Sequence, residues 1–515
     1  MFFLSDQENI VKMNLSVSTK EMYGEYKKHM RRIADIKNAS AVLEWDQETY
    51  LPSRGAGMRG QQLATLAELA QQLITEEGFG AQLEELNSRN GLSEKEKRNV
   101  VLSWEDYNRQ KKLSPSFIRS LTENISKSFH SWIEARKKNS FKVFEKDLDG
   151  VLQLKRQQAG LIGYERHPYD ALLDEYERGC TVALLDKTFD EIRQPLKELL
   201  DKIGSKKQVD NSFLHQFYPA QKQWDFGMAI VKQLGFDFDA GRQDIAEHPF
   251  TTSFNSHDVR ITTRINEKDC SSMIWSCIHE AGHALYEQGL PENEYGLPLG
   301  EPASLGMHES QSRLWENNIG RSLGFWKPAY PLLQEIFPGQ LGKIPASEFY
   351  KAINKVEPSF IRTEADELSY HFHIMIRYEL EKLLISGDLE TPDIPGWWNE
   401  QYENYLGLRI PDDKKGCLQD VHWSHGSFGY FPTYSLGSFY AAQLFAAAEQ
   451  QIPDLSRAVE AGDTLPLLGW LRTRIHHQGR MFTSEDLCLR ASGKTLDVRL
   501  FLRYLLDKFS KIYEF

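Results

Sequence analysis

Two histidines four residues apart on one apolar helix are the feature that most restricts how this chain can fold. They lie in SMIWSCIHEAGHALYEQGL, residues 272–290, as His279 and His283. One helical turn separates them, so both imidazoles leave the same face about 6 Å apart along the axis and can reach one ion. This H-E-x-x-H spacing is typical of a zinc-binding helix, and Glu280 is placed to act as general base on a water at the ion.

One helix cannot complete such a site, because a catalytic zinc site needs a third protein ligand. The stretch LGEPASLGMHESQSRLWENN, residues 299–318, predicts a second helix that begins after Ser304. Glu309 lies on its first turns and is the expected third ligand. Glu316 and Glu287 are alternatives that spacing alone does not exclude. The fold must therefore bring two helices across each other at the ion.

Residues beside the ligands have expected supporting roles. Gly282 costs about 1 kcal/mol relative to Ala in a helix interior, which predicts the close approach of another backbone. His308 is a candidate for contact with the substrate. Gln311 or Ser312 is expected to support the third ligand through a hydrogen bond.

The rest of the chain reads mainly as helix, with apolar residues at helical spacing. Helices are predicted at 20–38, 58–87, 94–112, 114–160, 182–203, 219–234, 272–288, 304–322, 346–355, 364–384, 395–406, 434–450, 453–461, 464–475 and 496–511. The exception is SHDVRITTRI, residues 256–265, which has the alternation of a strand. We expect its free edge to pair with an extended peptide, the alternative being a hairpin that only packs.

The composition and charge of the chain argue against several classes of function. The chain has 515 residues, no evident linker, and a formal net charge of −12, which argues against binding to nucleic acid or anionic membranes. Five scattered cysteines indicate reduced thiols and the cytoplasm. The N-terminus lacks the pattern of a signal peptide, and no run is long enough to span a membrane. We expect one domain over 1–515, with residues 1–12 as an extension and the site within 248–434.

Two polar clusters follow the predicted metal helices. In EPSFIRTEADELSYHF, Arg362 offers a bidentate fork for a carboxylate. Asp366 lies in the expected first turn of a helix and is expected to support a residue of the site through a hydrogen bond. The stretch GCLQDVHWSHGSFGYFPTY is rich in glycine and polar aromatic residues, a composition common in loops that line a site. Its candidates are Gln419, Asp420, His422, His425, Tyr430 and Tyr434.

Together these motifs resemble those of the carboxypeptidase Taq family of thermostable-type metallocarboxypeptidases, which are HExxH gluzincins. The matching pieces occur in the family's order and cover nearly the whole chain. They are HPF (248–250), DVRIT (258–262), HEAGH (279–283), HESQ (308–311), IRTEAD (361–366) and GCLQDVHW (416–423), with LEWDQETYLP (43–52) and HPYDALLDEYERG (167–179) also family-like.

The resemblance implies a mainly α, two-lobed helical clamshell with a deep central groove and a small β-strand element beside the metal helix, a neurolysin-like fold. It places the metal ligands on His279, His283 and Glu309 and the catalytic glutamate on Glu280. It also implies one divalent metal per chain, most often zinc with cobalt also supporting activity, and a homodimer. The implied reaction is the release of single C-terminal residues from peptides with broad specificity.

For that reaction, Tyr430 is the first choice and Tyr434 the second for stabilising the oxyanion. Arg362 is the expected clamp for the terminal carboxylate. Further substrate contacts are expected from His248, Asp258, Arg260, His308, Gln419, His422 and His425. Two other functions stay open: a clamshell zinc endo-oligopeptidase or dipeptidase, and a non-catalytic peptide-binding protein of the same fold.

Overall fold

The computed structural model describes residues 17–515, so the predicted extension over 1–12 lies outside the described residues. The α-helices are α2 (Thr19–Thr49), α3 (Ala56–Ile74), α4 (Glu77–Ser88), α5 (Glu94–Lys111), α6 (Pro115–Lys138), α7 (Lys142–Ile162), α8 (Asp170–Tyr176), α9 (Val182–Gly204), α10 (Ala220–Gln233), α11 (Cys270–Glu287), α12 (Leu305–Arg313), α13 (Leu323–Ile336), α14 (Pro338–Leu341), α15 (Ala346–Ala352), α16 (Tyr370–Ser386), α17 (Ile394–Leu406), α18 (Pro432–Gln451), α19 (Leu455–Glu460), α20 (Leu465–Arg474), α21 (Ser484–Ser492) and α22 (Val498–Tyr513). The mainly helical prediction is confirmed. No helix among residues 17–515 is long and apolar enough to cross a membrane.

Several predicted helices differ from the observed ones at their ends. The stretch 114–160 is two helices, α6 and α7, because Asn139 adopts the left-handed conformation (φ 51°) and ends the first. The stretch 58–87 is likewise divided into α3 and α4 around Thr75. The helix predicted at 364–384 begins only at Tyr370.

A three-stranded sheet lies beside α11, the helix that carries the H-E-x-x-H pattern. Its strands are β1 (Gly241–Ile245), β2 (Thr251–Asn255) and β3 (Asp258–Thr263), in the order β1-β3-β2. β3 confirms the strand predicted within 256–265, but the prediction that its edge is free is wrong. β1 pairs with it in parallel and β2 pairs antiparallel on the other side, so β2 is an edge strand and β3 is not.

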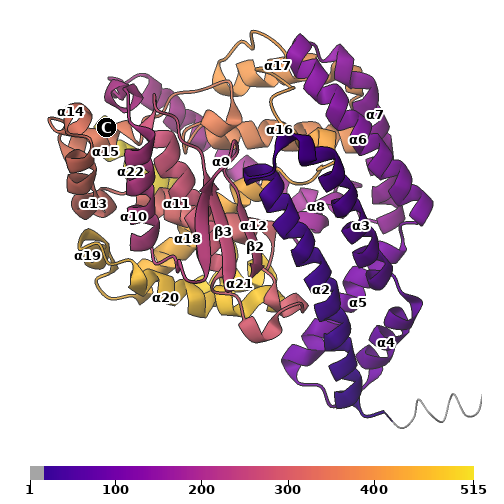
Figure 1. Cartoon of the computed structure of the whole chain (residues 1–515). Helices are drawn as coiled ribbons and strands as arrows, with labels where there is room; N and C mark the ends of the chain where they lie inside the picture. Colours follow the sequence, from indigo (N-terminus) through magenta and orange to yellow (C-terminus); the bar gives the residue numbers. More distant parts are fainter. Residues whose placement is uncertain (1–16) are drawn as a thin grey trace, which may run out of the picture.

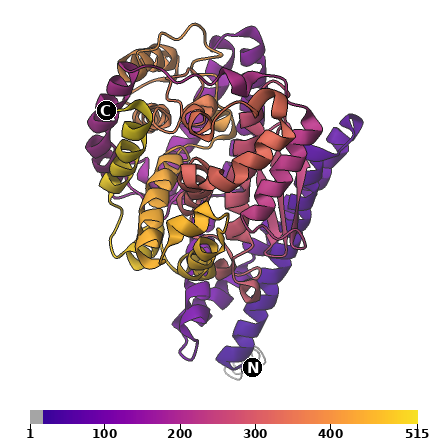
Figure 2. The ribbon, with the colours of Figure 1, turned by 90° about the vertical axis from the view of Figure 1, so that its left-hand side faces the viewer.

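The hydrophobic core falls into two clusters, which agrees with a two-lobed molecule. The smaller one joins α2, α4 and α5 through residues such as Tyr26, Phe79 and Leu83. The larger one runs from α6 to α22 and encloses α11, α12 and α18. Figure 1 shows the helices α2–α7 on one side of the sheet and α10, α13, α15 and α22 on the other. In Figure 2 the indigo and yellow ends of the chain lie on opposite sides of the magenta and orange helices.

Aromatic and charged side chains fasten α2 to the sheet. Two guanidinium groups lie near the ring of Trp45, with Arg260 at 4.3 Å and Arg242 at 5.3 Å from its centroid. The hydroxyl of Tyr50 donates to Asp244 on β1. Asn38 also donates to the backbone carbonyl of Phe254 on β2, at 2.6 Å. The N-terminal lobe is thus held against the sheet that lies over α11.

Candidate metal centre

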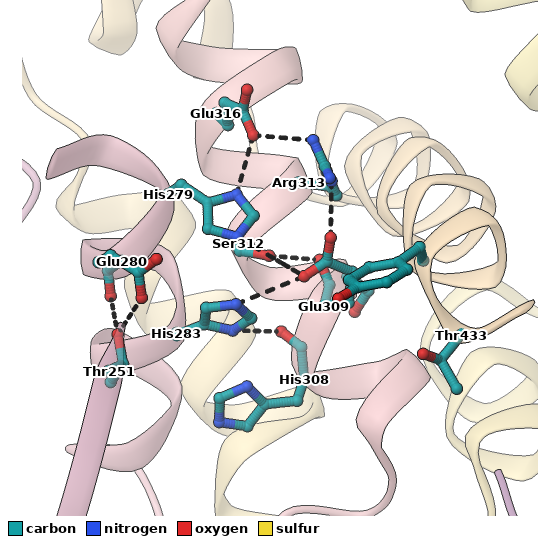
Figure 3. A network of polar contacts seen from close by, with 12 residues as sticks. Thr251, His279, Glu280, His283, His308, Glu309, Ser312, Arg313, Glu316 and Thr433 are labelled. Atoms are coloured by element: carbon teal, nitrogen blue, oxygen red, sulfur yellow. Dashed lines mark hydrogen bonds and ion pairs between the residues drawn. The ribbon is translucent and has the colours of Figure 1, made fainter. Parts of the chain in front are cut away.

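Two helices, α11 and α12, bring three predicted ligands together. One ligand atom from each of His279, His283 and Glu309 lies within 4.8 Å of the other two. Glu309 Oε2 is 3.7 Å from His279 Nε2 and 3.4 Å from His283 Nε2. Figure 3 shows both rings turned toward this carboxylate. Two imidazole nitrogens and one carboxylate oxygen form a donor set that suits zinc with one position left for water or substrate.

The Nδ1 atom of each histidine is already hydrogen-bonded, so the Nε2 atom is the one that faces the proposed metal position. His279 Nδ1 lies 2.9 Å from Glu316 Oε2, and His283 Nδ1 lies 3.1 Å from the backbone carbonyl of His308. Such partners orient the histidine ligands of metal sites and set their tautomers. Glu316, an alternative ligand by spacing, holds a ligand here. The donor set and its supports therefore fit a divalent metal.

The third ligand is kept ionised by its neighbours. Glu309 is 6% exposed, and burial alone would raise the pKa of its carboxyl. The guanidinium of Arg313, 2.7 Å from Glu309 Oε1, outweighs burial together with the two histidines, so the pKa of Glu309 lies well below its usual range. Ser312 Oγ donates to Glu309 Oε2 at 3.0 Å, in the supporting position expected of it.

The amide of Gln311 lies elsewhere. Its oxygen is 3.0 Å from His476 Nε2 and its nitrogen donates to Ser310, so it anchors α12 and does not touch the ligand carboxylate. Gly282 meets the expectation of a close helix crossing. A Cβ at this position would lie 2.6 Å from the Cα of Ser312 and 2.8 Å from the carbonyl oxygen of Gln311.

Glu280 lies beside the ligands on the face of α11 that turns toward β2. Its Oε2 accepts a hydrogen bond from Thr251 Oγ1 at 2.6 Å, as Figure 3 shows. The side chain is 7% exposed, and burial raises its pKa above the ordinary value. A buried carboxylate with a raised pKa suits a group that must take up a proton.

The two tyrosine candidates lie together beside the third ligand. The ring centroids of Tyr430 and Tyr434 are 5.3 Å apart, and His422 Nε2 is 3.3 Å from the hydroxyl oxygen of Tyr434. Burial raises the pKa of both phenols, and the negative charge of Glu309 raises each further. Both hydroxyls therefore stay protonated and able to donate.

Arg362 belongs to a buried charged network. Its Nε donates to Asp420 at 2.9 Å, and its Nη1 donates to the hydroxyl of Tyr370 at 3.1 Å. Its Nη2 has no hydrogen-bond partner within residues 17–515. Asp420 also pairs with Arg377 at 2.6 Å, and the Gln419 oxygen accepts from the Arg362 backbone N–H. Gln419 thus supports this network.

Other predicted contacts lie in different surroundings. Arg260 is bonded to Asp258 through two nitrogens, at 2.9 and 3.0 Å, and its guanidinium covers the ring of Trp45. His248 is exposed in the loop between β1 and β2. His425 is exposed beside Phe129, with ring centroids 4.8 Å apart. The structure does not gather these residues around the three ligands.

Asp366 serves the turn before α16. Its carboxylate accepts from the backbone N–H groups of Leu368 and Ser369 at 2.9 Å, and from that of Glu357 at 3.1 Å. Asp366 thus stabilises a turn and does not lie in the first turn of a helix. Thr251 and Arg313, in contrast, were not expected at the site. Thr251 is revealed only by its partner on another element, Glu280. Arg313 lies four residues after Glu309 and three before Glu316, a helical spacing from which both contacts could have been predicted.

Comparison with known proteins gives consistent matches along the chain. A family model described as carboxypeptidase Taq (M32) metallopeptidase matches residues 25–509. Carboxypeptidase 1 of Bacillus subtilis is 39% identical over 486 residues, which cover 94% of this chain and 97% of that protein. Thermostable carboxypeptidase 1 of Thermus thermophilus is 40% identical over 499 residues, with 94% and 97% covered. The crystal structure of M32 carboxypeptidase from Deinococcus radiodurans R1 has a TM-score of 0.94 at 38% identity, covering 96% of this chain and all of that one.

Proposed function

This chain belongs to the carboxypeptidase Taq (M32) metallopeptidase family, and on that premise we propose that His279, His283 and Glu309 hold one zinc ion while Glu280 serves as general base. The chain is a metal-dependent carboxypeptidase that acts on peptides. The observation that carries the proposal is the meeting of three ligand atoms within 4.8 Å, with both histidine Nδ1 atoms bonded on the far side.

Zinc is the metal that we propose, because a site of two imidazoles and one carboxylate is a common catalytic zinc site. When bound, the metal supplies Lewis-acid polarisation of the substrate carbonyl and of water. The charge of the ionised Glu309 offsets part of the charge of a dication in this buried centre. Cobalt shares the preference for such ligands closely enough to be a second metal that supports activity.

We assign proton transfer, positioning and oxyanion stabilisation to the side chains around the three ligands. Glu280 removes a proton from the attacking water and then delivers it to the leaving amine. Thr251 holds the carboxylate of Glu280 in place through its hydrogen bond. Tyr430 or Tyr434 donates to the oxygen on which negative charge develops.

An exopeptidase must also recognise the free end of its substrate. We assign this role to Arg362, whose Nη2 is the guanidinium nitrogen not engaged by Asp420 or Tyr370. The ring of Tyr434 lies 4.9 Å from its guanidinium carbon, so the clamp adjoins the oxyanion donors. A terminal carboxylate bound there would leave the preceding peptide bond near Glu309.

We further propose a cytoplasmic homodimer. All five cysteines are free and buried, which accords with a reducing compartment. The dimer rests on the family resemblance alone, and light scattering of the purified protein measures it.

Metal analysis of matched variants tests the proposed centre. We expect about one zinc per chain in the native protein and in Glu280→Gln, which keeps all three ligands. The latter variant should lose about 10³-fold in kcat, because it lacks the base. His283→Ala should lose both metal and activity. Retention of stoichiometric zinc by His283→Ala, or full activity of Glu280→Gln, would contradict the assignment.

A further inference from the structure

A large cavity opens beside the metal centre, between α5, α8 and the segment that leads into α12. Its volume is about 580 Å³, within the range of pockets that hold peptides and other small ligands. Glu287 and His308 line it at the inner end. The His308 ring stacks on the ligand His283 with centroids 4.5 Å apart, so the cavity begins directly next to the ligands.

The cavity lies on the opposite side of the ligands from Arg362. On the His279 side, Glu316 bonds Arg313, whose guanidinium lies 4.7 Å from the ring of Tyr370, and Tyr370 accepts from Arg362. On the His283 side lies His308, followed by the cavity. Figure 3 shows Glu316 and Arg313 above the two ligand rings and His308 below them. A peptide held by its C-terminus at Arg362 would thus extend its upstream residues into the cavity.

Arginine–carboxylate pairs line much of this cavity, and each presents its acidic member to solvent. In the Arg109–Asp174 pair the side chains are 27% and 41% exposed. In the Arg178–Glu105 pair they are 26% and 45% exposed. The guanidinium groups therefore lie beneath carboxylates that face the open space.

The third arginine repeats this arrangement. Arg480 is 19% exposed and bonds two carboxylates, Asp106 at 3.1 Å and Glu301 at 2.8 Å, which are 42% and 58% exposed. Two more carboxylates line the cavity: Glu175, which is 39% exposed and lies 4.0 Å from the buried Lys155, and Glu287, which is 13% exposed and bonded to His308. Six carboxylates thus line the cavity with three guanidinium groups, and all of the carboxylates except Glu287 are more exposed than the arginines.

From this arrangement we infer that the cavity is the subsite for the upstream part of the peptide and that it selects substrates with lysine or arginine before the last residues. The inference rests on the proposed roles of Arg362 and the metal ligands. Accessible carboxylates attract cationic side chains and repel acidic ones, and this preference weakens as salt screens the charges.

The test uses three acetylated heptapeptides that end in the same three alanines and carry four lysines, four glutamates or four serines upstream. We expect kcat/KM for release of the last alanine to be about tenfold higher for the lysine peptide than for the glutamate peptide at low salt. The ratio should shrink at high salt. Equal rates for the lysine and glutamate peptides, with the serine peptide also trimmed, would overturn the subsite and leave the carboxypeptidase intact. Failure to trim any of them would remove the proposed function, and this inference with it.

Matched variants locate the preference. Glu175→Gln combined with Glu301→Gln removes two accessible negative charges, while Arg480 keeps its ion pair with Asp106. The ratio of kcat/KM for the lysine peptide to that for the glutamate peptide should therefore fall by at least about threefold. The control is Glu460→Gln, which removes an exposed carboxylate paired with Lys327 and outside the cavity lining. An equal fall in both variants would show that net charge sets the ratio and would contradict the subsite.

Discussion

Each ligand histidine is held by a different kind of acceptor, a carboxylate for His279 and a backbone carbonyl for His283. The difference matters because Glu316 is ionised. Burial would raise its pKa, but Arg313 and His279 hold the pKa well below the usual range. The sequence predicted the three ligands and named Glu316 only as a rival to Glu309. The support of Glu309 by Ser312 was predicted. The bond between Glu316 and His279 was not, because it depends on which side chains face each other across the crossing of the two helices.

Arg362→Lys tests the clamp at the scale of one residue. Lysine keeps the charge beside Asp420 but lacks the planar fork, so KM for a free-acid peptide should rise at least about tenfold while kcat changes less. Steady-state kinetics with the free acid measure this effect. The amide, which is not expected to be cleaved, is the control and is tested as a competitive inhibitor, since it has no carboxylate to lose. An unchanged KM for the free acid, or an equal rise in the inhibition constant of the amide, would remove Arg362 from this role.

At the scale of elements, the crossing of α11 and α12 requires a glycine. Gly282→Ala should lower stability by about 1–3 kcal/mol despite alanine's better helix propensity, because the added methyl meets the backbone of Ser312. Separation of the helices should also weaken zinc binding. Denaturant unfolding and metal titration measure the two effects.

Gly24→Ala in α2 is the matched control, since a Cβ there would have no neighbour within 4 Å. This substitution should leave stability equal or raise it by up to about 1 kcal/mol, with zinc binding unchanged. Equal behaviour of the two variants would contradict the account of the crossing.

The sheet shows where prediction from the sequence failed. β3 alternates polar and apolar residues and was predicted. β1 was not predicted, because its two buried side chains, Gln243 and Asp244, are polar and consecutive, so they face opposite sides of the sheet and give no apolar alternation. β2 has only one buried residue, Phe254. The edge strand β2, which places Thr251 against Glu280, therefore could not be recognised in the sequence, although it contacts the proposed general base.

At the scale of the whole molecule, the helical class and the order of the motifs were predictable, since long amphipathic stretches dominate the chain. The assembly of the site was not. Arg480, for example, bonds Asp106 on α5, 374 positions earlier in the chain. Such contacts follow from the packing of lobes and leave no local pattern.

Buried histidines should make the metal-free protein sensitive to acid. Burial lowers the pKa of His371 and of His422 to about 3, and lowers those of His373 and His476 well below the ordinary value of 6.5. A lowered folded-state pKa gives stability that is present above pH 6.5 and is lost as the pH falls, at no more than about 1.4 kcal/mol per pH unit for each group.

Six carboxyls oppose this trend, because burial raises their pKa values: Glu177, Glu280, Asp366, Glu379, Glu381 and Glu449. The pKa rises to about 7 for Glu177 and Glu381, so the stability that these two give is present below pH 4.5 and lost as pH rises through 7. Eight histidines have lowered pKa values and outnumber these carboxyls, so the urea concentration at the unfolding midpoint should decrease as the pH is lowered from 6.5 to 5. Urea unfolding of metal-free protein measures it. His371→Gln should show a shallower fall, and an identical slope would contradict the assignment of His371.

The most direct test of the account is mass spectrometry of one defined peptide, as the free acid and as its C-terminal amide, incubated with zinc-loaded protein. The account predicts a ladder that loses one residue at a time from the free acid, with the amide intact and Glu280→Gln inactive. Internal cuts in both peptides would contradict it, because they would show that neither the free carboxylate nor its clamp directs cleavage.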